Sequence, residues 1–216
     1  NSGTNPSTNF IGTTDAKALQ IKVYNQKSGW IDYDAPYNTA WGYQILVNNT
    51  SGIANTASGY LALYSNNTGS GNTASGYQAL NSNTTANGNT ASGYQALYTN
   101  TTGSENTASG TGALYSNTGG YSNTASGYLV LFYNTTGDNN TASGYKALYS
   151  NTAGNNNTAV GYMAGYNITT GNNNIFIGYN AQPSSATVSN EVTIGNSNNN
   201  SYRMYAASWT NASDAR

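Results

Sequence analysis

The sequence predicts an all-β protein, a parallel β-solenoid or β-roll of about ten 17-residue coils. The first observation behind this prediction is the phrase Asn-Thr-Ala-Ser-Gly-Tyr, which recurs at a constant interval from Asn55 onward. The second is that the interval never slips, because a glycine stands at every seventeenth position from Gly42 to Gly195. Coils that stack on one another must keep such a register, whereas a linker between globular units drifts in length.

The amino-acid composition of the chain narrows the classes of function that it can have. Charged residues make up 6% of the 216 residues, the net charge is −1, and aromatic residues reach 12%. Disordered chains usually combine high net charge with few aromatic residues, so this composition favours a regular fold. Six scattered basic residues do not form the footprint that nucleic acid requires. No apolar run reaches the roughly 20 residues of a membrane span. We therefore expect no nucleic-acid partner and no membrane span.

The chain contains no Cys and no His. Disulfides, Cys or His metal sites and His-dependent catalytic triads are therefore excluded. We expect no metal, no cofactor and no catalytic residue, and we do not expect an enzyme.

Three regions are predicted: a lead-in and β-hairpin over residues 1–37, the β-roll over 38–199, and a C-terminal segment over 200–216. In the first region, Leu19, Ile21 and Val23 alternate with polar or exposed positions, which indicates a half-buried strand. Residues 25–29 are expected to turn and residues 30–33 to return as a second strand. A hairpin alone is marginally stable, so this one is expected to pack on the first coil or on other chains.

Each position of the 17-residue repeat can be assigned a structural role. Thr56-Ala57-Ser58 fits a short strand with Thr and Ser on one face and Ala on the other. Gly59 is expected to turn a corner through a positive φ or a close backbone approach. Residues 61–63 (Leu-Ala-Leu) and the later leucines supply the apolar filling, and residues 66–69 (Asn-Asn-Thr-Gly) read as a polar turn. Asn55 and its equivalents are expected to stack about 4.8 Å apart in an amide ladder.

Two features of the coils suggest self-association. The apolar filling per coil is thin, which leaves a single chain marginal against the entropy cost of folding and favours a homo-oligomer. In the last three coils Val160, then Ile175 and Ile177, then Val192 and Ile194 replace Thr or Ser. The Thr and Ser face is therefore expected to turn inward or toward another chain.

The sequence Thr158-Ala-Val-Gly161, and more closely Ile175-Phe-Ile-Gly178, resembles the head repeats of YadA-like trimeric autotransporter adhesins. Those heads are left-handed parallel β-rolls that assemble as trimers. The resemblance implies a homotrimer with an extracellular location, on a cell surface or in a virion fibre.

Residues 209–216 (Trp-Thr-Asn-Ala-Ser-Asp-Ala-Arg) are similar to the junction before an endosialidase-type intramolecular chaperone. That domain trimerises phage tail fibres and related surface fibres and then cuts itself off near a Ser-Asp step. The resemblance implies a cleavage junction at Ser213-Asp214 and a C-terminal chaperone as a partner in the precursor. The catalytic Lys of that domain is expected beyond Arg216.

Tyrosines form two columns along the repeat. The first contains Tyr43, Tyr60, Tyr77, Tyr94, Tyr128, Tyr145, Tyr162 and Tyr179. The second contains Tyr64, Tyr98, Tyr115, Tyr133 and Tyr149. Flat rings with polar tips suit contact with sugars or proteins, although both columns also fit ladders that only support the coil or an interchain seam. We take the second column as the candidate ligand-binding site.

Other candidates are weaker. Asp32 and Asp34 lie two residues apart on an expected strand and mimic an acid–base pair, but a solvated hairpin edge is the simpler interpretation. Glu105 and Asp138 lie near coil boundaries without the acidic density of a calcium site. The repeated Thr-x-Ser pairs also match a water-ordering, ice-binding surface.

These observations predict a structural or adhesive segment, the head or shaft of an extracellular trimeric fibre. It is expected to engage glycans or proteins of a host or prey surface through many weak contacts. Three alternatives remain open: a receptor-binding segment of a phage or virus tail fibre, an ice-binding solenoid, and a solenoid enzyme that acts on polysaccharides.

Overall fold

The computed structural model describes residues 19–23, 25–32 and 36–198, which contain twelve strands. These ranges hold no helix long and apolar enough to cross a membrane. The first two strands are β1 (Leu19–Val23) and β2 (Gln26–Ile31). The other ten have three residues each: β3 (Thr39–Trp41), β4 (Thr56–Ser58), β5 (Thr73–Ser75), β6 (Thr90–Ser92), β7 (Thr107–Ser109), β8 (Thr124–Ser126), β9 (Thr141–Ser143), β10 (Thr158–Val160), β11 (Ile175–Ile177) and β12 (Val192–Ile194).

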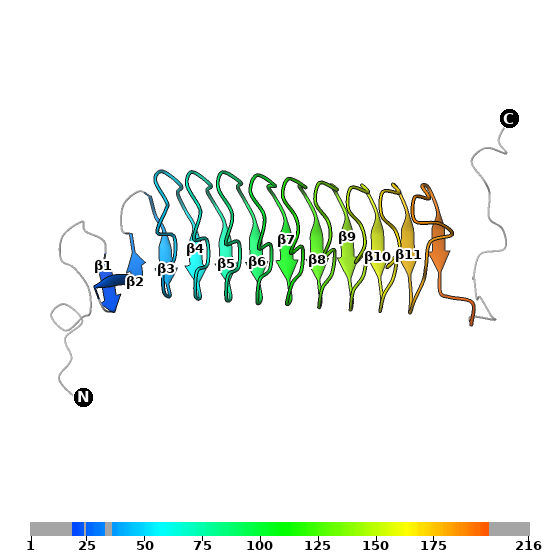
Figure 1. Ribbon diagram of the computed structural model, residues 1–216, viewed down its shortest axis with the longest axis horizontal. Coiled ribbons are helices and arrows are strands. Elements are labelled where there is room, and N and C mark those ends of the chain that lie inside the picture. Colours follow the sequence, from blue (N-terminus) through cyan, green and yellow to red (C-terminus); the bar gives the residue numbers. More distant parts are fainter. Residues whose placement is uncertain (1–18, 24, 33–35, 199–216) are drawn as a thin grey trace, which may run out of the picture.

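Strands β3 to β12 form one parallel sheet in which each residue pairs with the residue 17 positions later. Thr56 pairs with Thr73 and Ala57 with Ala74, and the same register continues to Ile177 and Ile194. Figure 1 shows these strands side by side along the long axis, with each coil looping away from the sheet and back. The predicted β-solenoid with 17-residue spacing is confirmed. Its ten strands are separated by nine turns.

The two N-terminal strands extend the sheet in the antiparallel sense. Val23 of β1 pairs with Gln26 of β2, and Trp30 of β2 pairs with Ala40 of β3. Strand β2 begins at Gln26 rather than at Trp30, inside the segment expected to turn. The reason is that Gln26, Lys27 and Gly29 already pair with residues of β1, so most of the segment expected to turn belongs to the strand.

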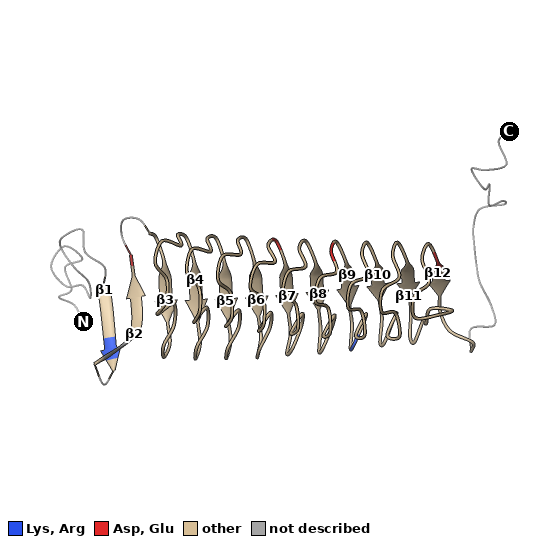
Figure 2. Ribbon diagram, turned by 45° about the horizontal axis from the view of Figure 1, so that its top comes forward, with Lys and Arg blue, Asp and Glu red and all other residues tan. Residues whose placement is uncertain are grey.

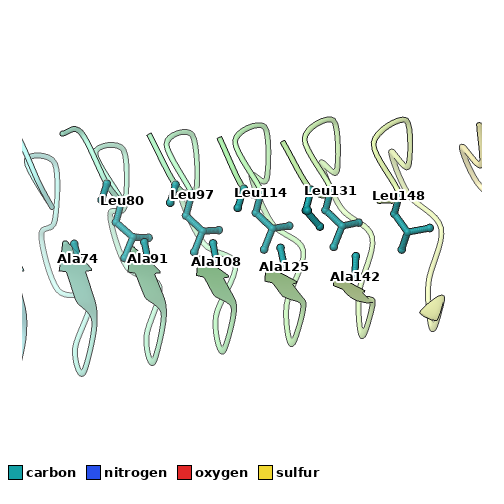
Figure 3. Packing of buried hydrophobic residues seen from close by; sticks show 14 of the residues in the cluster. Ala74, Leu80, Ala91, Leu97, Ala108, Leu114, Ala125, Leu131, Ala142 and Leu148 are labelled. Carbon is teal, nitrogen blue, oxygen red and sulfur yellow. The ribbon is translucent and has the colours of Figure 1, made fainter. Parts of the chain in front are cut away.

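The interior of each coil follows the expected division of faces. In β4 to β9 the central Ala is buried, while Thr and Ser are exposed. Ala62 and Leu63 are fully buried behind Ala57, and Leu61 is half-buried. Figure 3 shows the equivalent leucines of successive coils pointing toward the strand alanines. The apolar filling is therefore confirmed as one Leu and two Ala in each regular coil.

A ladder of buried asparagines runs along the first position of the coils, as predicted. The backbone N–H of Asn72 donates to Oδ1 of Asn55 at 3.0 Å, and its side-chain Nδ2 donates to the carbonyl of Ala86 at 2.9 Å. The same contacts recur in later coils, from Asn89 to Asn174. Each amide therefore fixes the backbone of its own coil and of the next one.

A second ladder adds buried hydrogen bonds to the polar bend that residues 66–69 form. Asn66 is fully buried, and its Nδ2 donates to Oδ1 of Asn49 at 2.7 Å and to the carbonyl of Gly69 at 2.9 Å. An amide carries both a donor and an acceptor, so a neighbour one coil away satisfies it without water. We call this set the second amide ladder: Asn49, Asn66, Asn83, Asn100, Asn117, Asn134 and Asn151.

The corner after each strand needs glycine for both expected reasons. Gly59 has a φ of +129°, and a Cβ built on it would lie 2.4 Å from the carbonyl oxygen of Gly76. Leu61 and Leu63 also adopt positive φ values, 55° and 49°, although they are not glycines. Hydrogen bonds to adjacent coils hold them there, since Leu61 N–H donates to the carbonyl of Tyr43 and Leu63 N–H to that of Ala79.

Candidate binding surface

The outer face of the parallel sheet carries two rows of side chains, one from each end of the three-residue strands. Thr56 and Ser58 point outward, and the Ala57 between them is 1% exposed. The expectation that this face turns inward is therefore wrong. The physical reason is the pleat of the strand, which gives the inward position to the small apolar residue. The other expectation, contact with a further chain, remains a prediction.

The same two rows become apolar in the last three strands. Val160, Ile177 and Ile194 form one row and are 45%, 42% and 51% exposed. Ile175 and Val192 continue the other row and are also exposed. Because β10, β11 and β12 pair in register, these five side chains form one continuous patch, which we call the apolar sheet patch.

One residue beyond the corner glycine, an exposed tyrosine stacks on its equivalent in the next coil. Ring centroids lie 5.0–5.5 Å apart, and neighbouring rings are nearly parallel. The ladder is interrupted where Thr111 replaces tyrosine. This corner ladder contains Tyr43, Tyr60, Tyr77, Tyr94, Tyr128, Tyr145, Tyr162 and Tyr179.

The second aromatic ladder differs in membership from the predicted column. It contains Tyr98, Tyr115, Phe132, Tyr149 and Tyr166, with ring centroids 5.0–5.6 Å apart. Three of the predicted residues, Tyr98, Tyr115 and Tyr149, are thus brought into one ladder. Tyr64 stands apart from it because Asn81 occupies the equivalent position in the following coil.

Tyr133 was assigned to this column wrongly. Phe132 holds the ladder position, because it lies 17 residues after Tyr115, and Tyr133 is the next residue. Its ring meets Phe132 edge-on at 5.0 Å and meets Tyr149 at 5.0 Å and 75°. Counting by 17 rather than by residue type would have found Phe132 and Tyr166 in the sequence.

Tyr149 lies between Phe132 and Tyr166 in this ladder, with Tyr133 across its edge. Burial, together with a hydrogen bond to Tyr133 and the neighbouring phenols, raises the pKa of Tyr149 to about 12. The phenol therefore stays neutral at physiological pH and keeps its O–H as a hydrogen-bond donor.

Between the two aromatic ladders runs a row of side chains whose chemistry changes from coil to coil. This variable row contains Leu61, Gln78, Gln95, Gly112, Leu129, Lys146, Met163 and Asn180. Gln95 Nε2 donates to Oε1 of Gln78 at 2.8 Å. Lys146 Nζ lies 5.4 Å from the ring centroid of Tyr145 and 5.1 Å from that of Tyr149. Lys146 therefore bridges the two ladders, a role that sequence reasoning missed.

The acidic residues are dispersed, and two of them accept hydrogen bonds from a neighbouring coil. Asp138 Oδ1 accepts from the Tyr121 N–H at 2.9 Å, and Glu105 Oε2 accepts from the Ser122 hydroxyl at 3.2 Å. Figure 2 shows the acidic segments of the coils along one edge and the basic segment at the opposite edge. Within the described ranges no group of three or more Asp, Glu, His or Cys could hold a metal ion.

Three residues singled out from the sequence lie outside the described residues. They are Asp34, Ser213 and Asp214. Asp32 is described, and its backbone N–H donates to the carbonyl of Asn38 at 3.0 Å.

The stack also has a hollow near each end. The N-terminal hollow has a volume of about 530 Å³ and is lined by residues that include Lys22, Trp30, Asp32 and Leu46. The C-terminal hollow, of about 580 Å³, is lined mainly by residues of β12 and the segments beside it. The surfaces with repeated chemistry lie along the stack and not at these ends.

Comparison of the chain with protein-family models, curated proteins and solved structures finds no match. The surface itself therefore has to indicate the function. It offers a flat hydroxyl and apolar sheet face, two parallel aromatic ladders and one cation between them. Such surfaces suit repeated, weak contacts with an extended partner.

Proposed function

We propose that this chain is a structural and adhesive segment of an extracellular homotrimeric fibre, on a cell surface or a virion. The observation that supports it best is the apolar sheet patch, which continues the uncharged Thr and Ser rows on the outer face of the sheet. Exposed apolar surface of this kind marks an interaction site. We assign this face to contact between copies of the chain.

Spacing and charge both favour a second copy as the partner. A partner that covers several coils must present its own side chains at the same axial interval, and another copy of this chain does so by construction. No charged residue lies in β3 to β12, so parallel copies bring no like charges together on this face. Copies arranged around a closed rotation axis would each cover one neighbour.

The interior of the coil changes one argument for assembly. Thin apolar filling alone suggested that a single chain is marginal, but the two amide ladders add buried hydrogen bonds that link every regular coil to the next. Assembly is therefore favoured by the exposed apolar sheet patch rather than by weakness of the interior. The C-terminal junction at Ser213 and Asp214, with a chaperone following it in the precursor, belongs to the same proposal.

Adhesion in such a fibre would come from repetition. Eight tyrosines of the corner ladder and five rings of the second ladder face solvent wholly or partly in each chain. Three chains would present these weak contacts together, which raises the overall affinity without strengthening any single contact.

Native mass spectrometry tests the assembly directly. The expected mass is that of three chains. In the double variant Ile177→Ser and Ile194→Ser, which makes the patch polar, we expect single chains. The matched control is Ile53→Ser, because Ile53 is equally exposed but lies outside the sheet. A wild-type chain that stays monomeric at micromolar concentration would refute the trimeric fibre.

An ice-binding surface is the second candidate. It is favoured by the exposure of Thr and Ser on six consecutive strands, β4 to β9, in one flat and regular array. This function requires the hydroxyl rows to face water in the assembled protein. Thermal hysteresis measured with wild-type protein and with a Thr90→Lys, Thr107→Lys variant would identify it, and the absence of hysteresis would exclude it.

A further inference from the structure

We propose that Lys146 and the aromatic rings on either side of it bind a carboxylated sugar. This inference rests on the adhesive function proposed above and names the class of ligand and its position. The site lies on the variable row, between Tyr145 of the corner ladder and Tyr149 of the second ladder.

Lys146 is the only basic residue between positions 36 and 198. Its ammonium group carries three donors, and its contacts among the described residues are the faces of Tyr145 and Tyr149. Neither ring face accepts a strong hydrogen bond, and no described carboxylate forms an ion pair with Nζ. The cation is therefore held in place while its donors remain available to an acceptor from outside.

The rings around Lys146 form two walls. Tyr145 stacks with Tyr128 and Tyr162 on one side, with centroids 5.4 and 5.0 Å away. Tyr149 stacks with Phe132 and Tyr166 on the other, at 5.6 and 5.1 Å. Because neighbouring rings cover these ring faces, a sugar on this surface would meet the ring edges and the phenol groups, which can donate to sugar hydroxyls.

The phenols add polar groups close to the cation. Tyr133 crosses the second ladder beside Tyr149, with its ring at 75° to that of Tyr149. Its hydrogen bond to Tyr149 keeps both side chains oriented at this point of the surface. A sugar beside Tyr149 would thus meet one cation and the outer edges of two tyrosines.

The charge on the site selects the class of anion. One ammonium group balances one negative charge, as in a carboxylated sugar, whereas a polyphosphate would need a cluster of basic residues. The acidic side chains Glu105 and Asp138 lie near coil boundaries, away from the variable row, so they do not oppose an anion there.

Another residue of the variable row, Gln95, allows a direct comparison with Lys146. Gln95 occupies the same position three coils upstream, between Tyr94 and Tyr98, with a φ of 54° against 53° for Lys146. The backbone and the types of the two ring neighbours are alike, whereas Ser82 occupies the position equivalent to Tyr133. A lysine at Gln95 is therefore expected to form a second site of the same kind.

Calorimetric titration with galacturonic acid and with its methyl ester tests the site, because esterification removes the single negative charge and leaves the sugar ring unchanged. Wild-type protein is expected to bind the acid about tenfold more tightly than the ester. Lys146→Gln should remove this preference. Lys22→Gln, which removes an exposed lysine on β1, should keep it, and Gln95→Lys should raise the number of acid molecules bound.

Equal affinity of wild-type protein for the two probes, no binding of either, or an acid preference that survives Lys146→Gln would each overturn the inference. Circular dichroism of every variant verifies that the fold is kept. The fibre proposal is judged separately by mass. A trimer without a preference for the acid would support the fibre proposal and refute the Lys146 site. A monomer that prefers the acid through Lys146 would refute the fibre proposal and support the site.

Discussion

Ile168 occupies the position one coil beyond Asn151 in the second amide ladder, and Asn151 Oδ1 is left without a hydrogen-bond donor. In earlier coils that oxygen accepts from the amide of the following asparagine, as Asn134 Oδ1 does from Asn151 Nδ2 at 2.8 Å. Ile168 is fully buried and has no donor to offer. The ladder therefore ends in one unsatisfied acceptor.

The unsatisfied acceptor at the end of the ladder predicts that the same substitution lowers the free energy of unfolding by different amounts at two positions. Asn117→Ala would leave Asn100 Oδ1 without its donor. Asn151→Ala would do the same to Asn134 Oδ1 but would also remove the oxygen that is already unsatisfied. We expect Asn117→Ala to lower the free energy of unfolding by about 1–3 kcal/mol more than Asn151→Ala, measured by urea denaturation.

The control must separate this effect from distance to the end of the stack. Leu114 and Leu148 lie in the same two coils and are both fully buried. Leu114→Ala and Leu148→Ala should therefore cost similar amounts, on the order of 2–5 kcal/mol each. If the two leucine variants differ as much as the two asparagine variants, position in the stack and not the ladder explains the result.

The corner glycines predict a second contrast. Gly76 has a φ of +141°, and a Cβ there would lie 2.4 Å from the carbonyl oxygen of Gly93. Gly76→Ala should cost more than about 3 kcal/mol, because backbone strain and a collision with fixed backbone act together. In Gly119→Ala the added Cβ meets nothing closer than 3.7 Å, so thermal unfolding should shift little. A tolerated Gly76→Ala would contradict the close packing of corners.

Glu191 should make the last coil sensitive to acid. Burial acts to raise the pKa of Glu191, but hydrogen bonds from Ser184 and from the Thr193 hydroxyl outweigh it and lower the pKa below its ordinary value. The resulting stability is present above the ordinary carboxyl pKa and is lost as the pH falls through the lowered value. Amide hydrogen exchange in β12 should accelerate over that acidic range.

Two variants check the assignment to Glu191. Glu191→Gln should remove the acid-dependent acceleration in β12. Glu105→Gln, in a distant coil, should leave it unchanged. Acceleration that persists in Glu191→Gln would show that another group is responsible.

Tyr149 predicts the opposite behaviour in alkali. Its pKa is raised to about 12, so the fold favours the neutral phenol. This contribution is fully present below the ordinary tyrosine pKa of about 10 and is lost as the pH rises through about 12. Tyr149→Phe should reduce the alkaline loss of stability, followed by circular dichroism. Tyr121→Phe, at an exposed position, is the control and should behave as wild type.

Much of the coil follows from local sequence. Thr56-Ala57-Ser58 alternates in period two, and Gly59 follows it at a position that only glycine tolerates, so the strand and the corner were predictable. Burial of Asn66 was not, because Asn-Asn-Thr-Gly has the composition of an exposed turn and the amide is satisfied only by the neighbouring coil. The positive φ of Leu63 likewise depends on its bond to Ala79.

The candidate site was predicted only in part, for two different reasons. Tyr98, Tyr115 and Tyr149 were found because they share residue type and register. Phe132 and Tyr166 were missed because the column was followed by residue type and not by strict 17-residue counting. Lys146 gave no signal as a single lysine in a varied row. Its significance depends on the distance between two ladders, which is a property of the coil cross-section.

The variable row has a practical consequence for how this molecule can diversify. Its backbone keeps nearly the same φ, between 52° and 55°, whether the side chain is Leu61, Gln95, Lys146 or Met163. One substitution in this row can thus change the side chain that a single coil exposes, while the length, strand pairing and interior of that coil stay the same. Duplicating a winding would transplant that chemistry intact, so new combinations of surface groups can arise from small genetic events.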